Sequence, residues 1–310
     1  MELAETQLQR RDVVTLSART APTAEPSRPP LAMSIDVEEW FHVENMRRAV
    51  PMHAWERQEV RVERVMDRML ELMALADVHA TCFVLGWVAT RMPSLVRRIA
   101  TAGHEIACHG YGHELVSQME PRAFRADVER AKNLLEDVTG RPVRGYRAPN
   151  FSVTEWALPI LRDLGFEYDS SLCPTTLPYR RYSKPKTLMT DPAVVTRRDS
   201  LIEVTVSCLP VGRHALPWGG GAYFRLIPYA LFKQGIEKIL AGGRPYVFYI
   251  HPWELDPAQP RVRGLRPSER ARHYLNLEKT EPRWAQLLRD FDWITIGELV
   301  DSYPHTAQVG

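Results

Sequence analysis

Short apolar runs alternate along most of this chain with longer segments whose apolar residues recur at helical spacing, and this alternation limits the possible folds more than any other feature. It begins with LAMSIDV at 31–37, which is typical of a buried strand, and continues with a helical period over 60–73. Strands that alternate with helices form a mainly parallel sheet flanked by helices. The pattern therefore predicts an α/β fold.

The same alternation extends to the end of the chain. Gly140 marks the end of a helix over 122–138, and Ser152 and Glu155 have the spacing of a capping box that opens a helix over 156–165. The other expected strands are 79–85, 104–110, 142–149, 166–171, 202–208, 245–251 and 293–296, and the other expected helices are 93–103, 229–243 and 283–291.

The two ends of the chain lack this pattern. Residues 1–30 are polar and finish in the proline-rich TAPTAEPSRPP, which predicts a flexible leader. We therefore expect a folded region over 31–304, with a C-terminal extension from about residue 256, and a short tail at 305–310.

The composition excludes several classes of protein. Hydrophobic residues make up 45% of the chain and charged residues 25%, which are ordinary values for a globular protein. Its 40 basic and 38 acidic residues give a net charge of +2, without the excess of basic residues that nucleic-acid-binding proteins carry. Nucleic acid is therefore not an expected partner. The 4 cysteines form no CxxC pair, so we expect reduced, buried thiols rather than a thiolate zinc site or a disulfide framework.

The sequence also lacks the features of a membrane protein. No stretch approaches the roughly 18 apolar residues of a spanning helix, and the N-terminus lacks the apolar core of a secretory signal. We therefore expect no transmembrane segment and a cytoplasmic location, with peripheral association at the inner membrane left open. The oligomeric state also stays open.

Five ionisable residues lie at the C-terminal ends of five different expected strands. They are Asp36, His109, Arg147, Asp169 and His251. In a parallel α/β barrel the carboxyl ends of the strands share one rim, where catalytic groups lie. Such a convergence predicts a site at this rim.

The motif HGYGH places His109 and His113 four residues apart, a spacing at which two imidazoles can face one cation. Surface or core histidines are the alternative reading, although the flanking Gly110 and Gly112 favour a special backbone path. SIDVEEW supplies Asp36, Glu38 and Glu39 directly after a strand. One of the carboxylates is expected to complete a metal site with an open fourth position, while another deprotonates water. An ordinary acidic loop is the alternative.

His251 follows the apolar run PYVFYI, which makes it a candidate general acid at the mouth of the site. Arg147 is expected to orient Asp36 through a bidentate ion pair, and Asp169 to hold His251 in its useful protonation state. A structural histidine and surface salt bridges are the alternatives.

In their order along the chain, the elements SIDVEE, HGYGH, YRAPNF, YDSS and YIH resemble the polysaccharide deacetylases of carbohydrate esterase family four, the NodB-homology group. The resemblance spans roughly residues 31–256. The stretches SIDVEEWFHVEN, GYRAPNFSV, LPWGGGAYFR and VFYIHPWELDPAQPR are similar to the subgroup associated with exosortase and exopolysaccharide gene clusters.

The resemblance implies a distorted (β/α) barrel with about seven parallel strands. It implies Asp36 as general base, His109 and His113 as metal ligands, and His251 as general acid. Arg147 would support Asp36, and Asp169 would support His251. Val37 stands where the family's acidic ligand commonly lies, so that ligand is assigned to Glu38. Asn150 displaces the aromatic residue that usually follows R-x-P, which leaves the oxyanion-hole amide open.

The expected reaction is metal-dependent hydrolysis of N-acetyl groups from amino sugars of an exopolysaccharide, peptidoglycan or chitin-like oligomer, with release of acetate. The metal is expected to be Zn²⁺, with Co²⁺ or Ni²⁺ as alternatives. An amidohydrolase acting on a small amide or formylated sugar, and a non-catalytic carbohydrate-binding relative, are the other hypotheses. Five aromatic residues are candidates for lining a sugar groove, with core packing as the alternative for each: Trp40, Phe151, Trp218, Tyr223 and Trp253. The glycines at 219–221 are expected to form a mobile or tightly turning loop beside that groove.

Overall fold

The computed structural model describes residues 28–176, 195–198 and 200–302. Most of the expected leader, residues 1–27, and the expected tail at 305–310 lie outside the described residues.

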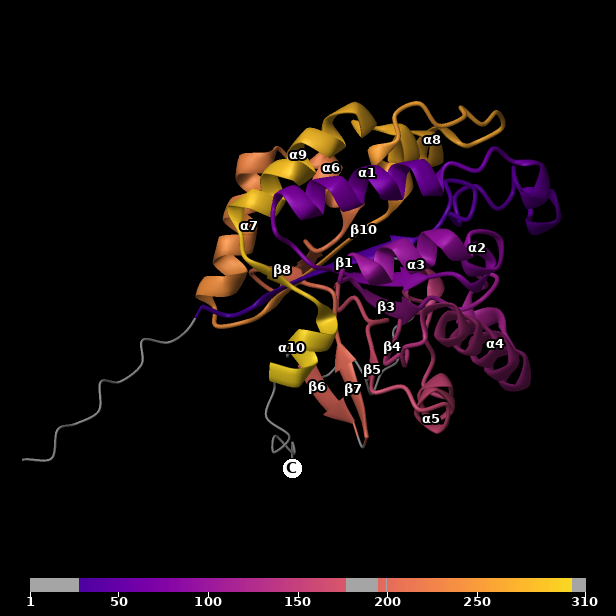
Figure 1. The fold of residues 1–310 in the computed structure, drawn as a ribbon. Helices are drawn as coiled ribbons and strands as arrows, with labels where there is room; N and C mark the ends of the chain where they lie inside the picture. The colour runs from indigo at the N-terminus through magenta and orange to yellow at the C-terminus, as the bar shows by residue number, and fades with distance from the viewer. Residues whose placement is uncertain (1–27, 177–194, 199, 303–310) are drawn as a thin grey trace, which may run out of the picture.

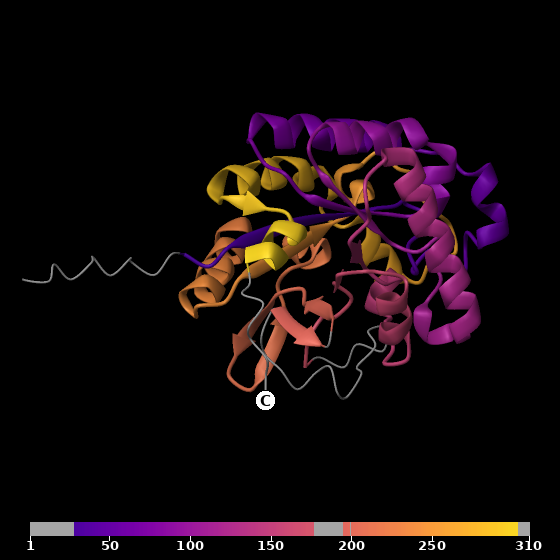
Figure 2. The same ribbon diagram turned by 60° about the horizontal axis from the view of Figure 1, so that its bottom comes forward.

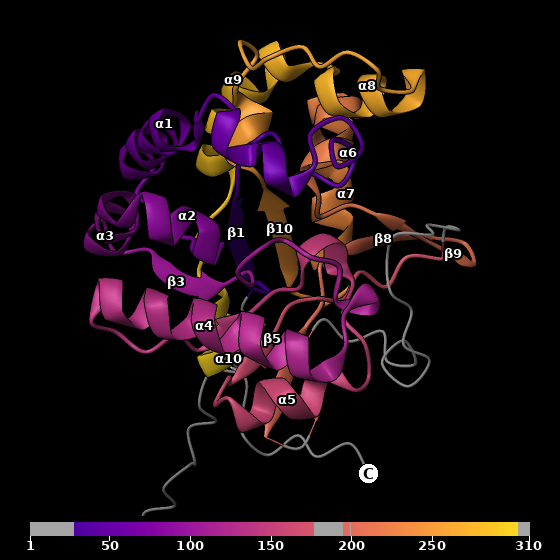
Figure 3. The ribbon, with the colours of Figure 1, turned by 90° about the vertical axis from the view of Figure 1, so that its right-hand side faces the viewer.

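A curled, mainly parallel sheet forms the centre of the protein, and helices surround it (Figures 1 and 3). Seven parallel strands are hydrogen-bonded in the order β10-β1-β2-β3-β4-β5-β7. Their bounds are β1 (Leu31–Val37), β2 (Thr81–Val84), β3 (Glu105–Cys108), β4 (Gly145–Tyr146), β5 (Tyr168–Asp169), β7 (Leu201–Val204) and β10 (Tyr246–Ile250). The expected α/β fold with about seven parallel strands is confirmed.

Four further strands complete the described sheets. Strand β11 (Trp293–Ile294) lies parallel beside the start of β1, and β6 (Val195–Arg198) pairs antiparallel with β7 at the edge of the sheet. The antiparallel pair β8 (Cys208–Val211) and β9 (His214–Pro217) forms a separate hairpin. The sequence analysis did not predict β6 or this hairpin.

Helices surround the sheet, as Figure 2 shows from a second direction. Helix α1 (Val62–Leu75), for example, buries residues at helical spacing such as Val62, Met66, Met69 and Met73. The other α-helices are α2 (Gly86–Arg91), α3 (Pro93–Thr101), α4 (Pro121–Thr139), α5 (Ala157–Asp163), α6 (Gly221–Leu226), α7 (Tyr229–Ala241), α8 (Pro267–Tyr274), α9 (Leu277–Asp290) and α10 (Ile296–Ser302). The described residues also form four short 3-10 helices: η1 (Met52–Arg57), η2 (Val116–Gln118), η3 (Pro149–Phe151) and η4 (Pro252–Leu255).

The two ends of the curled sheet meet through irregular backbone. The Ser207 amide donates to the Val247 carbonyl over 3.3 Å, and the Tyr249 amide donates to the Gly219 carbonyl over 2.7 Å. A Cβ on Gly219 would lie 2.4 Å from the Val247 carbonyl oxygen, so glycine is needed for this approach. The glycine run therefore bends at Gly219 and packs directly against β10, with Gly220 bridged to Tyr249.

The expected capping box at Ser152 and Glu155 is wrong. The Ser152 hydroxyl accepts from the Val116 amide over 2.9 Å and donates to the Pro149 carbonyl over 2.6 Å. Helix α5 begins only at Ala157, and its N-terminus has no side-chain cap. Ser152 and Glu155 therefore precede the helix and do not cap its N-terminus.

The 4 cysteines, all within the described ranges, are free, and 3 of them are buried. Among the described helices, none combines the length and the apolar character that crossing a membrane would require.

Candidate metal centre

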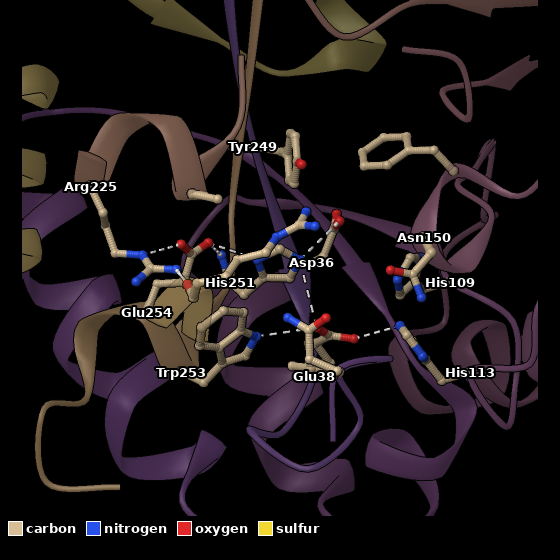
Figure 4. Close-up of a pocket in the computed structure, with 15 residues that line it drawn as sticks. Asp36, Glu38, His109, His113, Asn150, Arg225, Tyr249, His251, Trp253 and Glu254 are labelled. Carbon is tan, nitrogen blue, oxygen red and sulfur yellow. Dashed lines mark hydrogen bonds and ion pairs between the residues drawn. The ribbon is translucent and has the colours of Figure 1, made fainter. Parts of the chain in front are cut away.

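Several of the expected site residues lie together at the rim formed by the carboxyl ends of the strands, as Figure 4 shows. Asp36 comes from the end of β1 and Glu38 from the residues directly after it. His109 follows β3, and His251 follows β10. All four side chains line one pocket. Parallel strands bring them together because their carboxyl ends lie on the same edge of the sheet.

Glu38, His109 and His113 form a group that could hold a metal ion. Each offers one ligand atom, and these atoms all lie within 4.8 Å of one another. All three residues are at most 4% exposed. Glu38 Oε2 lies 2.7 Å from His113 Nε2, yet no hydrogen bond satisfies this buried oxygen. Two imidazoles and a carboxylate with an unsatisfied oxygen are a donor set that suits Zn²⁺ and similar divalent ions.

The neighbours of His109 keep its ring in the form that binds metals. Its Nδ1 lies 2.8 Å from the carbonyl oxygen of Arg147, an arrangement in which Nδ1–H donates and Nε2 keeps a lone pair. Burial lowers the pKa of His109 to about 4, so the ring is neutral near neutral pH. A neutral imidazole with a fixed tautomer is what metal coordination requires.

The loop that carries His113 follows an unusual backbone path. His113 has a φ of 53° and Gly110 a φ of 74°, both in the left-handed region. The Asp127 carboxylate on α4 accepts hydrogen bonds from the amides of Tyr111 (2.8 Å) and Gly112 (3.3 Å). Asp127 therefore holds the loop in place, a role that the sequence analysis missed because α4 follows much later in the chain.

Glu38 is surrounded by groups that keep it ionised. Burial favours the neutral acid, but the neighbouring His113, His251 and His109 lower the pKa of Glu38 well below its usual range. The Trp253 indole donates to Glu38 Oε1 over 3.2 Å, which leaves Oε2 directed toward His113. The geometry thus brings Glu38, and not Asp36, into the group of possible ligands.

Asp36 is held by Arg147, whose side chain is completely buried. Arg147 Nη1 donates to Asp36 Oδ1 over 2.6 Å and to Ser34 Oγ over 2.9 Å, while Nε donates to the Ser170 carbonyl over 3.0 Å. The pair is joined by this single hydrogen bond rather than the bidentate contact that we expected. Asp36 Oδ2 faces the pocket and lies 3.8 Å from His251 Nε2.

His251 is held by Glu254, three residues further along the chain. The two are joined over 2.8 Å between Nδ1 and Oε1, and Arg225 Nε donates to the other Glu254 oxygen over 2.7 Å. Burial disfavours the charged ring, but the hydrogen bond to Glu254 and the nearby carboxylates raise the pKa of His251 to about 9. Its Nε2 lies 3.6 Å from Glu38 Oε1. The sequence analysis missed both Glu254 and Arg225, although the spacing of His251 and Glu254 in HPWE was a usable signal.

Asp169 does not support His251 as we expected. It accepts a hydrogen bond from Ser171 and shares one with Glu203, which is its register partner on the neighbouring strand β7. Burial raises the pKa of Asp169 to about 6. Strand pairing decides this placement, because β5 and β7 lie side by side while β10 is at the other end of the sheet.

Only some of the expected aromatic residues line the pocket. Phe151 and Trp253 do so, whereas Tyr223 lines a neighbouring groove. Trp40 is buried and donates to the Glu59 carbonyl, and Trp218 stacks on Phe232 with ring centroids 5.5 Å apart. Both therefore belong to the core. The full pocket lining is Asp36, Glu38, Val43, Asn45, His109, His113, Asn150, Phe151, Ala222, Arg225, Tyr249, His251, Trp253, Glu254 and Arg272.

Asn150 also lines the pocket. In the sequence it drew attention only because it displaces the aromatic residue that usually follows R-x-P. Asn150 and Phe151 have φ values of 51° and 54° in succession, a strained conformation for residues other than glycine. The Phe151 ring packs against Tyr249, with ring centroids 4.9 Å apart. The Asn150 side-chain amide nitrogen has no hydrogen-bond partner in the structure and lines the pocket.

Comparison with known proteins divides the chain into two parts. Residues 57–168 match the family model described as polysaccharide deacetylase, and residues 170–301 match a domain of unknown function, DUF3473. Arg147 and the two histidines of HGYGH lie in the first part, and His251, Glu254 and Arg225 lie in the second.

Several curated proteins are similar to part of the chain. A peptidoglycan deacetylase from Helicobacter pylori is 31% identical over 105 residues, which is 34% of this chain and 36% of that protein. A peptidoglycan deacetylase-like protein from Gibberella zeae is also 31% identical over 105 residues, 34% of this chain and 31% of its own length. The matched segment thus spans about a third of these relatives.

One solved structure is similar over nearly the whole chain. It is a Mycobacterium smegmatis protein provisionally described as a polysaccharide deacetylase, with 21% identity, a TM-score of 0.58, and coverage of 94% of this chain and 98% of that one. At this identity the likeness shows the fold, which is a curled sheet of the same (β/α) barrel type. Residues 57–168 are thus similar to polysaccharide deacetylases, and the described chain shares the fold of this solved structure.

Proposed function

We propose that this protein is a metal-dependent deacetylase that hydrolyses N-acetyl groups of amino sugars in a polysaccharide and releases acetate. One observation carries the proposal: a group of possible metal ligands, Glu38, His109 and His113, lies in one pocket with Asp36 and His251. These are the parts that hydrolysis of an amide requires, namely a metal site, a base and an acid.

In this proposal, Glu38, His109 and His113 hold the ion. Zn²⁺ suits the donor set best, with Co²⁺ and Ni²⁺ as alternatives. A divalent ion bound there would polarise the amide carbonyl and lower the pKa of water toward neutrality. The contact of His109 Nδ1 with the Arg147 carbonyl leaves Nε2 as the ligand atom of the ring. The hydrogen bond from the Trp253 indole holds Glu38 Oε1 and leaves Oε2 as the ligand atom of the carboxylate.

Asp36 acts as the general base. Arg147 occupies Oδ1 of the carboxylate, which leaves Oδ2 toward the pocket to take a proton from the attacking water. The water oxygen forms the new bond to the acetyl carbon. Because Arg147 is buried and held by Ser34 and Ser170, the base is fixed in orientation.

His251 acts as the general acid. Its Nδ1 is engaged by Glu254, so Nε2 is the atom that faces the pocket. When the bond between the acetyl carbon and the nitrogen breaks, Nε2 gives its proton to the departing amine. The products are acetate and a free amino sugar. Asp169 has no role in this proposal beyond the fold, because its partners are Ser171 and Glu203.

The substrate class rests on the comparisons and on the sequence. Curated relatives are named as peptidoglycan deacetylases and as a chitooligosaccharide deacetylase. The stretches similar to the exosortase-associated subgroup make an exopolysaccharide the first polymer to test. We assign residues 31–304 to the catalytic unit, since β10 and β11 of the second part pair with β1 in the same sheet.

The proposal is tested by measuring acetate release from acetylated exopolysaccharide fragments, peptidoglycan and chitooligosaccharides with zinc-loaded protein. We expect Asp36→Asn to lower kcat by about 10²- to 10⁴-fold, because the general base is lost. Metal content should be retained, since Asp36 is not in the ligand group. A protein that binds the glycan but releases no acetate under any metal would contradict the proposal. Turnover of small amides alone would move the assignment to an amidohydrolase.

A further inference from the structure

Three side chains form a continuous buried chain behind the pocket. His251 Nδ1 lies 2.8 Å from Glu254 Oε1, and Glu254 Oε2 accepts from Arg225 Nε over 2.7 Å. Glu254 is 1% exposed and Arg225 2%. Figure 4 shows the carboxylate between the guanidinium and the imidazole.

Arg225 is fixed by backbone on its far side. Nη1 donates to the carbonyls of His273 (3.1 Å) and Leu275 (2.7 Å), and Nη2 donates to that of Arg272 (2.9 Å). These carbonyls belong to the end of α8 and the residue after it. The guanidinium therefore has one orientation, in which Nε is aimed at Glu254.

Glu254 is fixed in the same way by its surroundings. It lies on η4, where the His251 amide donates to Oε1 over 3.3 Å, so one oxygen holds both the ring and the backbone of His251. A Cβ on Gly221 would lie 2.1 Å from Oε1, so only glycine leaves room for the carboxylate. Helix α6, which begins at Gly221, thus supplies both this space and Arg225.

The contact with Glu254 fixes the orientation of the His251 imidazole. A histidine ring without a partner can turn over and exchange its two nitrogens, and either nitrogen can carry the proton. A carboxylate at Nδ1 selects one ring orientation and one tautomer. A buried carboxylate in turn needs a cation, because an unpaired charge in the interior is strongly unfavourable. Arg225 is that cation.

We propose that Glu254 and Arg225 are positioning residues for His251. Arg225 fixes the Glu254 carboxylate, which accepts the Nδ1–H bond and aims His251 Nε2 at the space beside Asp36 and Glu38. The kinetic consequence rests on the proposed function, in which His251 is the general acid. Both residues lie in the part of the chain that matches a domain of unknown function, so the pair gives residues 170–301 a role at the site.

The kinetic test uses Glu254→Gln, Arg225→Met and the double variant, assayed for acetate release. We expect Glu254→Gln to lower kcat by about 10- to 100-fold, the range found when a residue that orients a functional histidine is removed, while KM stays within about twofold. The double variant should be no worse than Glu254→Gln alone within about twofold, because Arg225 acts through Glu254. Multiplying losses in the double variant, or an unchanged kcat in Glu254→Gln, would overturn the proposal.

The matched control is Asp256→Asn. Asp256 directly follows η4, is 4% exposed, and pairs with Arg61 rather than with a pocket residue. This variant also breaks a buried ion pair in the same segment. It should lower stability but leave kcat within about twofold of the wild type. An equal loss of kcat in Asp256→Asn would mean that the Glu254→Gln effect is merely structural.

A second measurement does not depend on catalysis. In NMR spectra of protein labelled with ¹⁵N-histidine, the His251 Nδ1 proton should be protected from exchange in the wild type and lost in Glu254→Gln, assigned with His251→Gln. If the wild type releases no acetate but shows this signal, the proposed function is wrong, while the hydrogen bond between His251 Nδ1 and Glu254 is confirmed. Absence of a protected Nδ1 proton in the folded wild type would overturn the contact itself.

Discussion

Arg147 and Asp36 are joined by one hydrogen bond of 2.6 Å between Nη1 and Oδ1, in a place where the guanidinium is fully shielded from water. The same guanidinium bonds Ser34 Oγ, the Ser170 carbonyl and Ser170 Oγ, and it lies 4.0 Å from the centre of the Phe83 ring. The orientation of the proposed base is therefore tied to the interior of the sheet and not to a surface ion pair.

Replacement of Arg147 by lysine should damage both stability and activity. An ammonium group cannot reproduce the planar set of bonds, so Asp36 would lose its fixed partner in a buried position. We expect the free energy of unfolding to fall by about 3 kcal/mol and kcat by more than about tenfold. Urea unfolding and acetate release measure the two effects. Arg144→Lys is the control, since Arg144 is paired near the surface with Glu167 and Asp301, and its loss of stability should stay below about 1 kcal/mol.

The neighbouring acids Glu38 and Glu39 should behave differently toward metal. Glu38 lies in the ligand group, whereas Glu39 Oε1 accepts from the backbone amides of Arg61 (2.6 Å) and Val62 (2.8 Å) at the start of α1. We expect Glu38→Gln to lose zinc during dialysis and Glu39→Gln to retain it, as measured by elemental analysis. Retention of one equivalent of zinc by Glu38→Gln would show that this residue is not a ligand. His109→Ala should lose zinc and activity together.

Asp127 should control metal affinity without touching the metal. Its carboxylate holds the amides of Tyr111 and Gly112, between the two histidines of the motif. We expect Asp127→Asn to weaken zinc binding by about 10- to 100-fold, because the loop would no longer be held in its left-handed path. Titration against a chelator measures the change. Asp137→Asn, an exposed position on the same helix, should bind zinc like the wild type.

Stability should fall in mild acid because of a buried histidine far from the pocket. His104 accepts a hydrogen bond from the Ala80 amide through Nδ1, and burial lowers its pKa from 6.5 to about 4. The unfolded chain takes up the proton more readily, so the stabilisation is complete above the unfolded pKa and is lost as the pH falls from 6.5 toward 4.

We expect the free energy of unfolding to drop by about 1 to 2 kcal/mol through this group between about pH 7.5 and about pH 5. His104→Asn keeps an acceptor for Ala80 and should flatten the pH dependence measured by urea unfolding. The exposed His53 serves as the control, and His53→Asn should leave the curve unchanged. An identical slope in wild type and His104→Asn would refute this prediction.

Much of the fold was predictable because it depends on apolar periodicity. The run LAMSIDV became β1, and the helical period over 122–138 became α4, which ends at Gly140 with a φ of 67°. The exact ends of the helices were less predictable. Ser152, for example, has the spacing of a capping residue, but helix α5 begins only at Ala157 and has no side-chain cap.

The residues of the site were largely predictable, but the hydrogen-bond partners of these residues were less so. Asp36, Glu38, His109, His113 and His251 do gather in one pocket, but Asp169 pairs with Glu203, and Glu254 takes the place beside His251. The aromatic residues show the same limit. Trp218 and Trp253 were equal candidates in the sequence, yet of these two only Trp253 lines the pocket, whereas Trp218 stacks on Phe232.

The sequence by itself determined that strands and helices alternate and that metal-binding and acid-base side chains follow the strands, because periodicity and residue chemistry are local properties of the chain. Only the tertiary structure decided which side chains meet. That depends on strand order and register: β10 lies beside β1, which brings His251 to Asp36, and β7 lies beside β5, which takes Asp169 away from both. Contacts between residues more than a hundred positions apart, such as Trp253 with Glu38, arise from packing in three dimensions, and no local pattern encodes them.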